Sequence, residues 1–478
     1  MCKDDSFCCV ALTFEGFEKR KVCERIEMKS SVAKYLLYYP TVILRGEKVG
    51  KYLKEYIRTQ WWERNAIIDY QSTRLSGLLR HAKKYVPFYE RSFRDIEISK
   101  VKGIEDLQHL PIINKEDIRL NYKELVSVKK PIVTSVKTTG GSTGEAVTII
   151  KTRDALARER AATWRSYMWA GVGIGDRQAR FWGVPFGFGG RLKCKMIDFI
   201  SNRIRLSAFS FDEESLRNYY IKLMTFKPAY LYGYVSFIET FARFVESNGL
   251  PLPFKLKCVI VTSEVLTEIT RKYLEEVFNC RVFNEYGCGE VGSIAHECEV
   301  GNLHIMSENV IIEILAGGEH TLDSEVGEIV ITELNNYVMP LIRYRLSDFA
   351  EYTMNSCNCG RGLPVIRRIM GRAYDIIRGP DGRLFHGEFF LYIFEEVKKL
   401  NLGVKQFQVI QTGSCELRIR IVPDRNFSDE TKRYILGCLV NRMGTKINVQ
   451  FEIVDTIPRE PSGKIRLVKA LEKAAFEE

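Results

Sequence analysis

Residues 138–145 read Thr-Thr-Gly-Gly-Ser-Thr-Gly-Glu and bring three glycines and four hydroxyl side chains into eight positions. The runs on either side, 132–136 and 146–150, are rich in β-branched residues and predict two strands joined by this loop. Backbone N–H groups and hydroxyls gathered in such a loop can cradle phosphate oxygens. The loop lacks the Gly-Lys-Ser/Thr ending of a Walker A motif and the spacing of a dinucleotide fingerprint. Taken alone, it fits a polar hairpin turn equally well, because glycine and serine are common turn residues.

The pattern around this loop predicts an α/β protein with a second, smaller unit. Residues 1–70 read as a mostly helical extension, and strands alternate with helices from about 130 to 295, which favours a mainly parallel sheet. Residues 303–352 switch to short strands with turns. We therefore expect a large N-terminal α/β domain over 1–370 with a β-rich subregion, followed by a small mobile α+β domain over 371–478. In the latter, strands are predicted at 406–411, 415–422 and 447–454, and helices at 387–399 and 428–442.

Composition limits the possible partners and locations. The chain has 478 residues, 45% of them hydrophobic and 27% charged, as in ordinary globular proteins. Its net charge of +11 suits an anionic ligand, but the charge is spread along the chain without a basic arm, so we expect no nucleic-acid partner. The thirteen cysteines favour reduced thiols, and the apolar run at 7–12 is too short for a bilayer. We expect a cytoplasmic protein without a membrane span, and the sequence leaves its oligomeric state open.

Three further stretches carry residue types suited to nucleotide chemistry. Tyr286 and Glu290 lie in a segment expected to follow a strand, where a ring can stack on a purine and a carboxylate can hold Mg²⁺. Residues 342–348 are predicted to form a strand that ends in Asp348, which could accept hydrogen bonds from ribose hydroxyls. Lys464 follows Gly463 near the end of the chain, where a closing domain could deliver its charge. Each stretch also has an ordinary reading, as a turn, a structural aspartate or an exposed lysine.

Together, in this order and spacing, these motifs resemble the adenylate-forming superfamily of acyl-CoA synthetases. The likeness is greatest to the phenylacetate–CoA ligase branch and its CapK-type capsule-biosynthesis proteins, and it includes the segments 78–82, 86–89 and 110–115. It covers nearly the whole chain from about residue 60. The resemblance implies a fold with a large N-terminal domain and a C-terminal lid, and an enzyme that is an AMP-forming acid–thiol ligase.

The resemblance also implies a set of functional residues. Those expected to bind ATP or AMP are Thr139, Ser142, Thr143, Gly144, Ser263, Glu264, Tyr286, Gly287, Asp348 and Arg372. Lys464 and Glu290 are expected to be catalytic, with Lys464 bridging the substrate carboxylate and the α-phosphate and Glu290 placing Mg²⁺. The substrate pocket is expected near Trp182, Phe186, Tyr232 and Tyr234.

The implied reaction is ATP-dependent activation of a carboxylic acid as an acyl-adenylate, followed by transfer to a thiol, with CoA as the expected acceptor. Two alternatives stay open: transfer to a carrier protein or to a sugar amine or hydroxyl, and a non-catalytic nucleotide-binding scaffold. Two positions depart from the family pattern, since Glu145 stands where many relatives have lysine and Tyr374 where the hinge aspartate is usual. The acid itself cannot be read from the sequence.

A possible metal site lies downstream of the nucleotide motifs. Cys298 and His304 follow the Tyr286 segment, and Cys357 and Cys359 follow Asp348. Cysteine and histidine pairs from two loops can form a tetrahedral Cys₃His site, and relatives in this branch include members with such a zinc. The four residues could also be unrelated. Because protein ligands would fill all four positions, we expect a structural zinc.

Overall fold

The computed structural model describes residues 28–129, 131, 134–138, 147–182, 188–207, 212–372, 377–380, 384–385, 387–413, 415–458 and 466–470. Helices dominate the first described part of the chain, from residue 28 to residue 120. They are α1 (Ser30–Val32), the π-helix η1 (Ala33–Tyr38), α2 (Tyr39–Leu44), α3 (Val49–Thr59), α4 (Arg64–Tyr85), α5 (Pro87–Ser92) and α6 (Lys115–Leu120). Helix α4 ends at Tyr85, and its C-cap residue Val86 is extended because the ring of Pro87 disfavours helical backbone at the residue before it. Asn114 caps α6 in a reciprocal capping box with Asp117.

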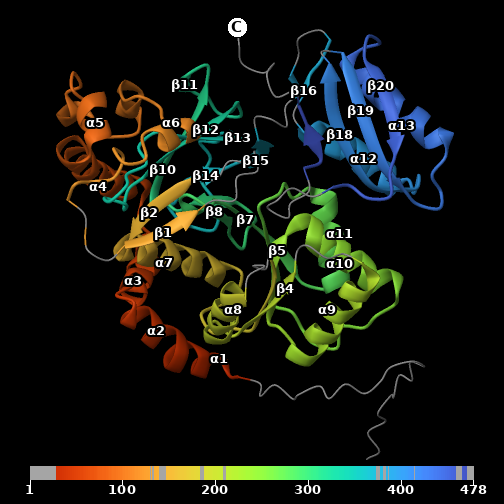
Figure 1. The fold of residues 1–478 in the computed structure, drawn as a ribbon, viewed down its shortest axis with the longest axis horizontal. Coiled ribbons are helices and arrows are strands. Elements are labelled where there is room, and N and C mark those ends of the chain that lie inside the picture. Colours follow the sequence, from red (N-terminus) through yellow and green to blue (C-terminus); the bar gives the residue numbers. More distant parts are fainter. Residues whose placement is uncertain are drawn as a thin grey trace, which may run out of the picture.

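An eight-stranded sheet forms the centre of the molecule (Figure 1). Its order is β14 (Val365–Ile366), β9 (Leu303–Ile305), β8 (Gly292–Glu297), β7 (Arg281–Cys288), β6 (Cys258–Thr262), β5 (Tyr230–Tyr234), β3 (Gln178–Trp182) and β4 (Arg203–Ser207). The strands from β7 to β4 are parallel, and the hairpin from β7 to β8 starts an antiparallel extension.

Helices cover both faces of this sheet because alternate strand residues point to opposite sides. Leu231, Val259 and Val261 pack in one core with α9 (Glu213–Phe226), α10 (Val235–Ser247) and α11 (Glu268–Phe278). Tyr230, Tyr232 and Ile260 face the other way and pack with Tyr167 of α7 (Arg153–Trp169). The predicted α/β class is confirmed.

A second, antiparallel sheet corresponds to the predicted β-rich subregion. Its order is β11 (Glu319–His320), β10 (Val310–Ala316), β12 (Val326–Glu333), β13 (Tyr344–Glu351) and β15 (Arg368–Arg372). Its apolar side chains share one core with those of α4 to α6. A separate hairpin of β1 (Thr134–Thr138) and β2 (Thr148–Thr152) carries the Gly-rich loop between its strands.

The C-terminal residues form a four-stranded sheet with its own core. Its order is β20 (Asn448–Ile453), β19 (Glu416–Pro423), β18 (Val404–Gly413) and β21 (Val468–Lys469), with α12 (Gly387–Lys399), α13 (Asp429–Met443) and the short pair β16 (Ile377–Arg378) and β17 (Leu384–Phe385). These elements lie beside α10 and α11 (Figure 1), and Lys398 Nζ is 3.4 Å from Glu239 Oε1 of α10. The division between residues 1–370 and 371–478 stays a prediction.

The structure corrects three local predictions. Strand β7 runs through Cys288, so Tyr286 lies inside a strand rather than after it, because the β8 hairpin extends the pairing. Strand β13 continues past Asp348 to Glu351, because β12 and β15 pair with it on both sides. Helix α8 (Phe188–Ile200) begins two positions after the expected pocket residue Phe186 and was not among the predicted elements. Within the described ranges, no helix is long and apolar enough to cross a bilayer.

Candidate nucleotide site and metal centre

Several predicted site residues lie outside the described parts of the chain. These are Thr139, Ser142, Thr143 and Gly144 of the phosphate loop, Phe186 of the substrate pocket, and Lys464. Arg372 is described in its backbone, which pairs in register with Asp348 across β15 and β13. The resemblance predicts that Asp348 and Arg372 lie near each other, and the register of β13 and β15 brings their backbones together.

The hairpin that carries the phosphate loop is fixed to the body by buried charges. Lys137 of β1 and Lys151 of β2 both pair with Glu159 of α7, and Lys151 Nζ is also 2.8 Å from Glu333 Oε1 at the end of β12. Burial alone would lower the pKa of the fully buried Lys151, but the carboxylates of Glu333 and Glu159 outweigh it and raise that pKa above its ordinary value. The lysine therefore stays charged and holds the base of the hairpin in place.

Tyr286 and Asp348 meet between the two main sheets. The hydroxyl of Tyr286, on β7, donates a hydrogen bond of 2.8 Å to Oδ2 of Asp348, on β13. The predicted adenine-binding ring and the predicted ribose-binding carboxylate thus lie side by side although 62 positions separate them in sequence. Gly287 follows at a point where a Cβ atom would lie 2.4 Å from the carbonyl oxygen of Gly292, so the close approach of β7 and β8 requires glycine there.

Glu290, in the turn between β7 and β8, receives a second hydrogen bond from β13, in the opposite direction. The hydroxyl of Tyr344, in β13, donates to Oε1 of Glu290 at 3.1 Å. Lys115 Nζ lies 3.8 Å from the same oxygen. Burial raises the pKa of Tyr344, and the neighbouring Glu290 raises it further, so the tyrosine remains a neutral donor. Glu290 is 4% exposed, and these contacts hold its carboxylate at the edge where Asp348 also lies.

Sequence reasoning did not assign Lys115 to the site, although it ended one of the segments that carried the family resemblance. Two backbone hydrogen bonds fix the segment before it to β13: Ile113 N donates to Arg343 O at 3.0 Å, and Arg345 N donates to Ile113 O at 2.8 Å. The capping box of Asn114 then begins α6 at Lys115. The capping signal at Asn114 was visible in the sequence, but the contact with Glu290 depends on tertiary structure.

Ser263 and Glu264 lie directly after β6, at the carboxyl end of the parallel strands. Ser263 has φ +70°, a left-handed conformation that is uncommon for a residue with a side chain. The Glu264 carboxylate accepts hydrogen bonds from Ser236 N at 2.7 Å and from Ser236 Oγ at 3.0 Å, so it stabilises the first turn of α10. Its observed contacts therefore serve the helix, and the nucleotide-binding role of both residues stays a prediction.

The described residues of the predicted substrate pocket form an aromatic group at the carboxyl ends of β3 and β5. The ring of Trp182 stacks on Tyr232 at 5.7 Å and lies 4.6 Å from the ring of Tyr234. The Arg180 guanidinium lies over the rings of Trp182 and Tyr232. The three predicted aromatic residues are thus brought together, with a cation beside them.

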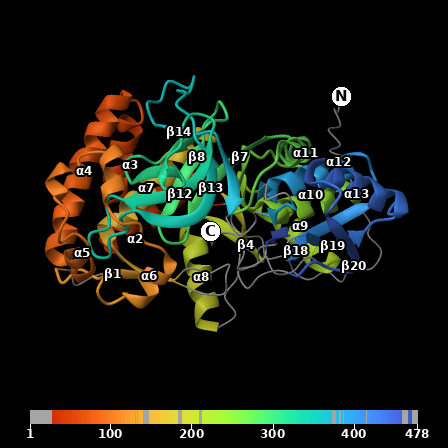
Figure 2. The ribbon, with the colours of Figure 1, turned by 90° about the horizontal axis from the view of Figure 1, so that it is seen from above.

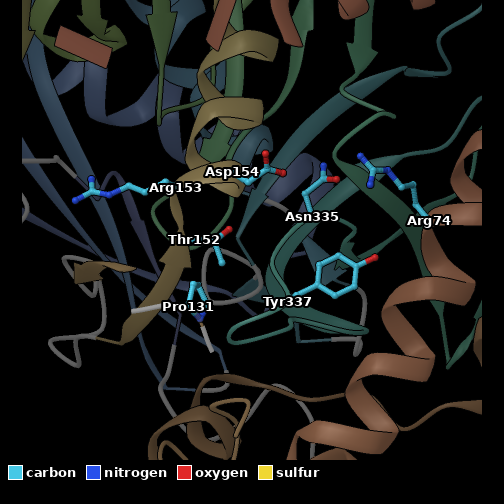
Figure 3. Close-up of a pocket in the computed structure, with 7 residues that line it drawn as sticks. All are labelled: Arg74, Pro131, Thr152, Arg153, Asp154, Asn335 and Tyr337. Carbon is cyan, nitrogen blue, oxygen red and sulfur yellow. The ribbon is translucent and has the colours of Figure 1, made fainter. Parts of the chain in front are cut away.

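A separate cavity of about 370 Å³ lies at the base of the β1–β2 hairpin (Figure 3). It is lined by Arg74, Pro131, Thr152, Arg153, Asp154, Asn335 and Tyr337. Thr152 pairs with Thr134 at the end of the hairpin remote from the phosphate loop. None of its lining residues is a predicted nucleotide or acid ligand, so this cavity is distinct from the candidate site.

Cys298, His304, Cys357 and Cys359 form one cluster, as predicted. Their four ligand atoms all lie within 4.8 Å of one another. Cys298 Sγ is 3.6 Å from Cys357 Sγ, and Cys359 Sγ is 3.3 Å from His304 Nε2. Tetrahedral zinc with Zn–S bonds of about 2.3 Å separates two sulfur atoms by roughly 3.8 Å. The donor set and its spacing therefore fit Zn²⁺.

The surroundings of the cluster also suit a metal. His304 Nδ1 is 2.9 Å from the carbonyl oxygen of Leu363, a contact that leaves Nε2 as the nitrogen facing the sulfurs. The backbone N–H groups of Val300 and Cys359 donate to Cys298 Sγ and Cys357 Sγ, respectively, each at 3.4 Å. Such hydrogen bonds stabilise thiolates over thiols. All four side chains point at one another, so the site has no open position for a substrate.

Known proteins resemble the chain over most of its length. Residues 378–470 match the family described as the CapK C-terminal domain. Protein CapK of Staphylococcus aureus is 26% identical over 426 residues, which cover 84% of this chain and 89% of that protein. The phenylacetate-coenzyme A ligase of Thermus thermophilus is 26% identical over 437 residues, covering 84% of this chain and 96% of that enzyme.

Solved structures agree with these relatives on the fold. The 2-hydroxyisobutyryl-CoA ligase in its postadenylation state, in complex with R3-HIB-AMP, superposes with a TM-score of 0.67 at 19% sequence identity. The match covers 84% of this chain and 89% of that one. The resemblance to the phenylacetate–CoA ligase and CapK branch is thereby confirmed.

Proposed function

Because the chain is a relative of CapK and of the phenylacetate–CoA ligases, we propose that it is an AMP-forming ligase. It activates a carboxylic acid with ATP, releases pyrophosphate, and passes the acyl group from the adenylate to the thiol of CoA. The observation that carries this proposal is the meeting of Tyr286 on β7 and Glu290 in the turn after it with β13 of the other sheet, which supplies Asp348. A scaffold would have no physical need to gather a ring and two carboxylates at one edge.

The nucleotide would lie along this edge. An ionised carboxylate offers about four lone-pair positions, so Asp348 can accept both ribose hydroxyls and keep its hydrogen bond from Tyr286. The Tyr286 ring, held by that bond, supplies the surface for adenine. The loop at 139–146 supplies backbone N–H groups and hydroxyls for the phosphates.

Charge at the reacting phosphate is supplied by residues of this chain. Negative charge gathers on the α-phosphate as the acid attacks it, and preorganised cations stabilise that charge. Lys464 is assigned this role, and Lys115 adds a fixed positive charge beside Glu290. Glu290 would hold Mg²⁺, which supplies Lewis-acid stabilisation of the phosphate oxygens when it is bound.

Domain arrangement and metal content complete the proposal. The segment 371–478 is the lid that brings Lys464 to the nucleotide edge, and Arg372 lies at its start, opposite Asp348. The Cys298, His304, Cys357 and Cys359 cluster would bind one structural Zn²⁺, which ties the end of β8 to the loop after β13. The acid would lie against Trp182, Tyr232 and Tyr234, and Phe186 is assigned to the same proposed pocket.

Pyrophosphate release over a panel of carboxylic acids, with and without CoA, tests the activity. We expect acid-dependent release, and with the right acid we expect consumption of one CoA thiol per pyrophosphate. Replacing Lys464 by Ala should lower the adenylation rate by about 100-fold or more. Lys405→Ala is the matched control, since this exposed lysine lies in the same C-terminal region. Undiminished pyrophosphate exchange in the Lys464 variant would show that the catalytic assignment is wrong.

The same assay separates the alternatives. Pyrophosphate release that never consumes the CoA thiol would favour a carrier-protein, amine or hydroxyl acceptor. ATP binding with no acid-dependent release across the panel would favour the non-catalytic scaffold.

A further inference from the structure

The first described helices expose a row of large apolar side chains. Val32, Leu36 and Ile43 follow at spacings of four and seven residues, which places them along one side of the continuous helical segment from α1 to α2. They are 39%, 68% and 68% exposed, and Leu44 at the end of α2 is 88% exposed. A contiguous row of this kind differs from scattered surface apolar residues, because it marks an interaction surface.

Helix α8 carries a second row next to the first. Leu192, Met196 and Phe199 lie on one face of the helix at spacings of four and three residues, and they are 62%, 59% and 53% exposed. Helix α8 packs against η1 and projects from the body when the molecule is viewed from above (Figure 2). The two rows therefore belong to neighbouring helices at one side of the protein (Figure 1).

The charges around both rows have a single sign. Every exposed charged residue within 28–54 and 192–200 is a cation: Lys29, Arg45, Lys48, Lys51, Lys54, Lys193 and Lys195. These stretches hold only two acidic residues, and both are buried in ion pairs. Glu47 accepts from Arg45 Nε at 3.1 Å, and Asp198 accepts from Arg205 Nη2 at 3.1 Å. Glu47 therefore offsets the charge of Arg45, which leaves the lysines as the positive rim.

We propose that this surface, the exposed apolar residues of 32–44 and α8 with their surrounding cations, docks on the face of an anionic lipid bilayer. Large apolar side chains on one side of a helix and lysines beside them are the pattern of helices that lie in the membrane interface. The apolar rows enter the headgroup and acyl boundary, and the long lysine side chains reach the lipid phosphates. The protein binds the surface of the bilayer without crossing it.

The charge pattern favours a bilayer over a second copy of the chain. Pairing this face with itself would oppose two rims of like charge, because the stretches 28–54 and 192–200 hold no exposed carboxylate. An anionic leaflet attracts each lysine near its surface, which strengthens binding by about fivefold per residue at moderate salt. This inference is independent of the acid and of the acceptor, because none of its residues belongs to the proposed ATP or acid site.

Vesicle flotation of the full chain tests the proposal. The probes are vesicles of phosphatidylcholine alone and of phosphatidylcholine with about one third phosphatidylglycerol, each at low salt and at roughly 0.5 M salt. We expect partition onto the anionic vesicles, loss of most of it at high salt, and little binding to the neutral vesicles. Equal binding to both compositions, or no binding to either, would overturn the proposal.

Variants locate the binding face. The triple change Leu192→Ser, Met196→Ser and Phe199→Ser should weaken binding to anionic vesicles by at least about tenfold. Changing both Lys193 and Lys195 to Gln should weaken it by roughly 25-fold, at about fivefold per lysine. The matched control changes Leu120, Leu322 and Met354 to Ser, because these residues are 76%, 71% and 70% exposed at other sites. Equal loss in the control and in the α8 variant would contradict the assignment.

Two further readouts keep the result interpretable. Melting temperature and acid-dependent pyrophosphate release should be unchanged in the α8 variants, which shows that they fold. Sedimentation at increasing protein concentration tests for a second copy on this face. Self-association that the α8 triple change abolishes, without any vesicle binding, would replace the bilayer by a dimer and overturn the proposal.

Discussion

The nucleotide edge and the cysteine–histidine cluster are built from the same two stretches of chain but differ in how their side chains are used. Tyr286 and Asp348 hydrogen-bond across from β7 to β13, and the same two strands lead to Cys298 and Cys357. At the nucleotide edge, carboxylates keep lone pairs for further donors. In the cluster, four ligand atoms lie within 4.8 Å and face only one another.

The difference separates a site for turnover from a site for stability. A substrate site must leave ligand positions open, whereas a structural metal site has all four filled by protein. Because β7–β8 and β13 supply both, a metal at one end would fix the strands that present the residues at the other. Substitutions at the two ends should therefore affect different measurements, and four predictions test that separation.

The largest effect is expected at the metal end. Replacing Cys357 by Ser should reduce bound zinc from about one per chain to a small fraction and lower the melting temperature by roughly 10 °C, since losing a structural zinc removes several kcal/mol of folding free energy. Elemental analysis and thermal unfolding measure both quantities. Cys280→Ser, a thiol outside the cluster, is the control. A Cys357 variant that loses activity per folded molecule with its stability intact would break the comparison.

The next largest effect is expected at the nucleotide end. Asp348→Ala removes a carboxylate that would accept charge-assisted hydrogen bonds from ribose, so kcat/KM for ATP should fall by about 100-fold or roughly 2.7 kcal/mol. Zinc content should not change. Steady-state kinetics with ATP varied, together with elemental analysis, check both statements. Asp323→Ala, at an aspartate outside the predicted nucleotide and metal sites, serves as the control. A normal kcat/KM in the Asp348 variant would remove the ribose assignment.

The fold class and the residues that belong to each candidate site could be predicted from the sequence. The contacts between the side chains of those residues could not. The alternation of strands and helices between 130 and 295 was predicted, and it includes α9 and α11, because capping residues and apolar periodicity are local signals. Helix α8 was missed because its first residues continue a glycine- and aromatic-rich stretch typical of a loop. Lys115 escaped assignment because only the bridge from Ile113 to β13 brings it to Glu290.

A third prediction uses the interior side of β7. Burial raises the pKa of Glu285, although the hydroxyl of Tyr167, 3.1 Å away, and other donors partly lower it. At pH values just above the ordinary pKa of a carboxyl group, Glu285 therefore keeps its proton in the folded state and loses it in the unfolded state. Stability from this group is complete at low pH and is lost as pH rises through the folded pKa. Glu285→Gln keeps the shape without the charge.

We expect the stability difference between the Glu285 variant and the natural chain to grow in favour of the variant from about pH 4.5 upward and then to level off. Denaturant unfolding at several pH values measures it. This stability difference should be smaller than the loss of stability caused by Cys357→Ser. The kcat/KM for ATP at equal folded concentration should not change. A difference that stays constant with pH would show that Glu285 is ionised in the folded protein.

The smallest effect is expected from Tyr286→Phe, which tests how far the two halves of the nucleotide edge depend on each other. The change keeps the ring for adenine and removes only the 2.8 Å hydrogen bond to Asp348. A single hydrogen bond to a charged acceptor is worth about 1.5–3 kcal/mol at most, and ribose hydroxyls can satisfy the same carboxylate in the complex. We therefore expect KM for ATP to rise about fivefold with kcat nearly unchanged.

In the double variant with Asp348→Ala, the Tyr286 change should add almost nothing, because its partner is already gone. Full additivity in that cycle would mean that the tyrosine and the aspartate act on ATP separately, and the edge would then consist of two independent contacts.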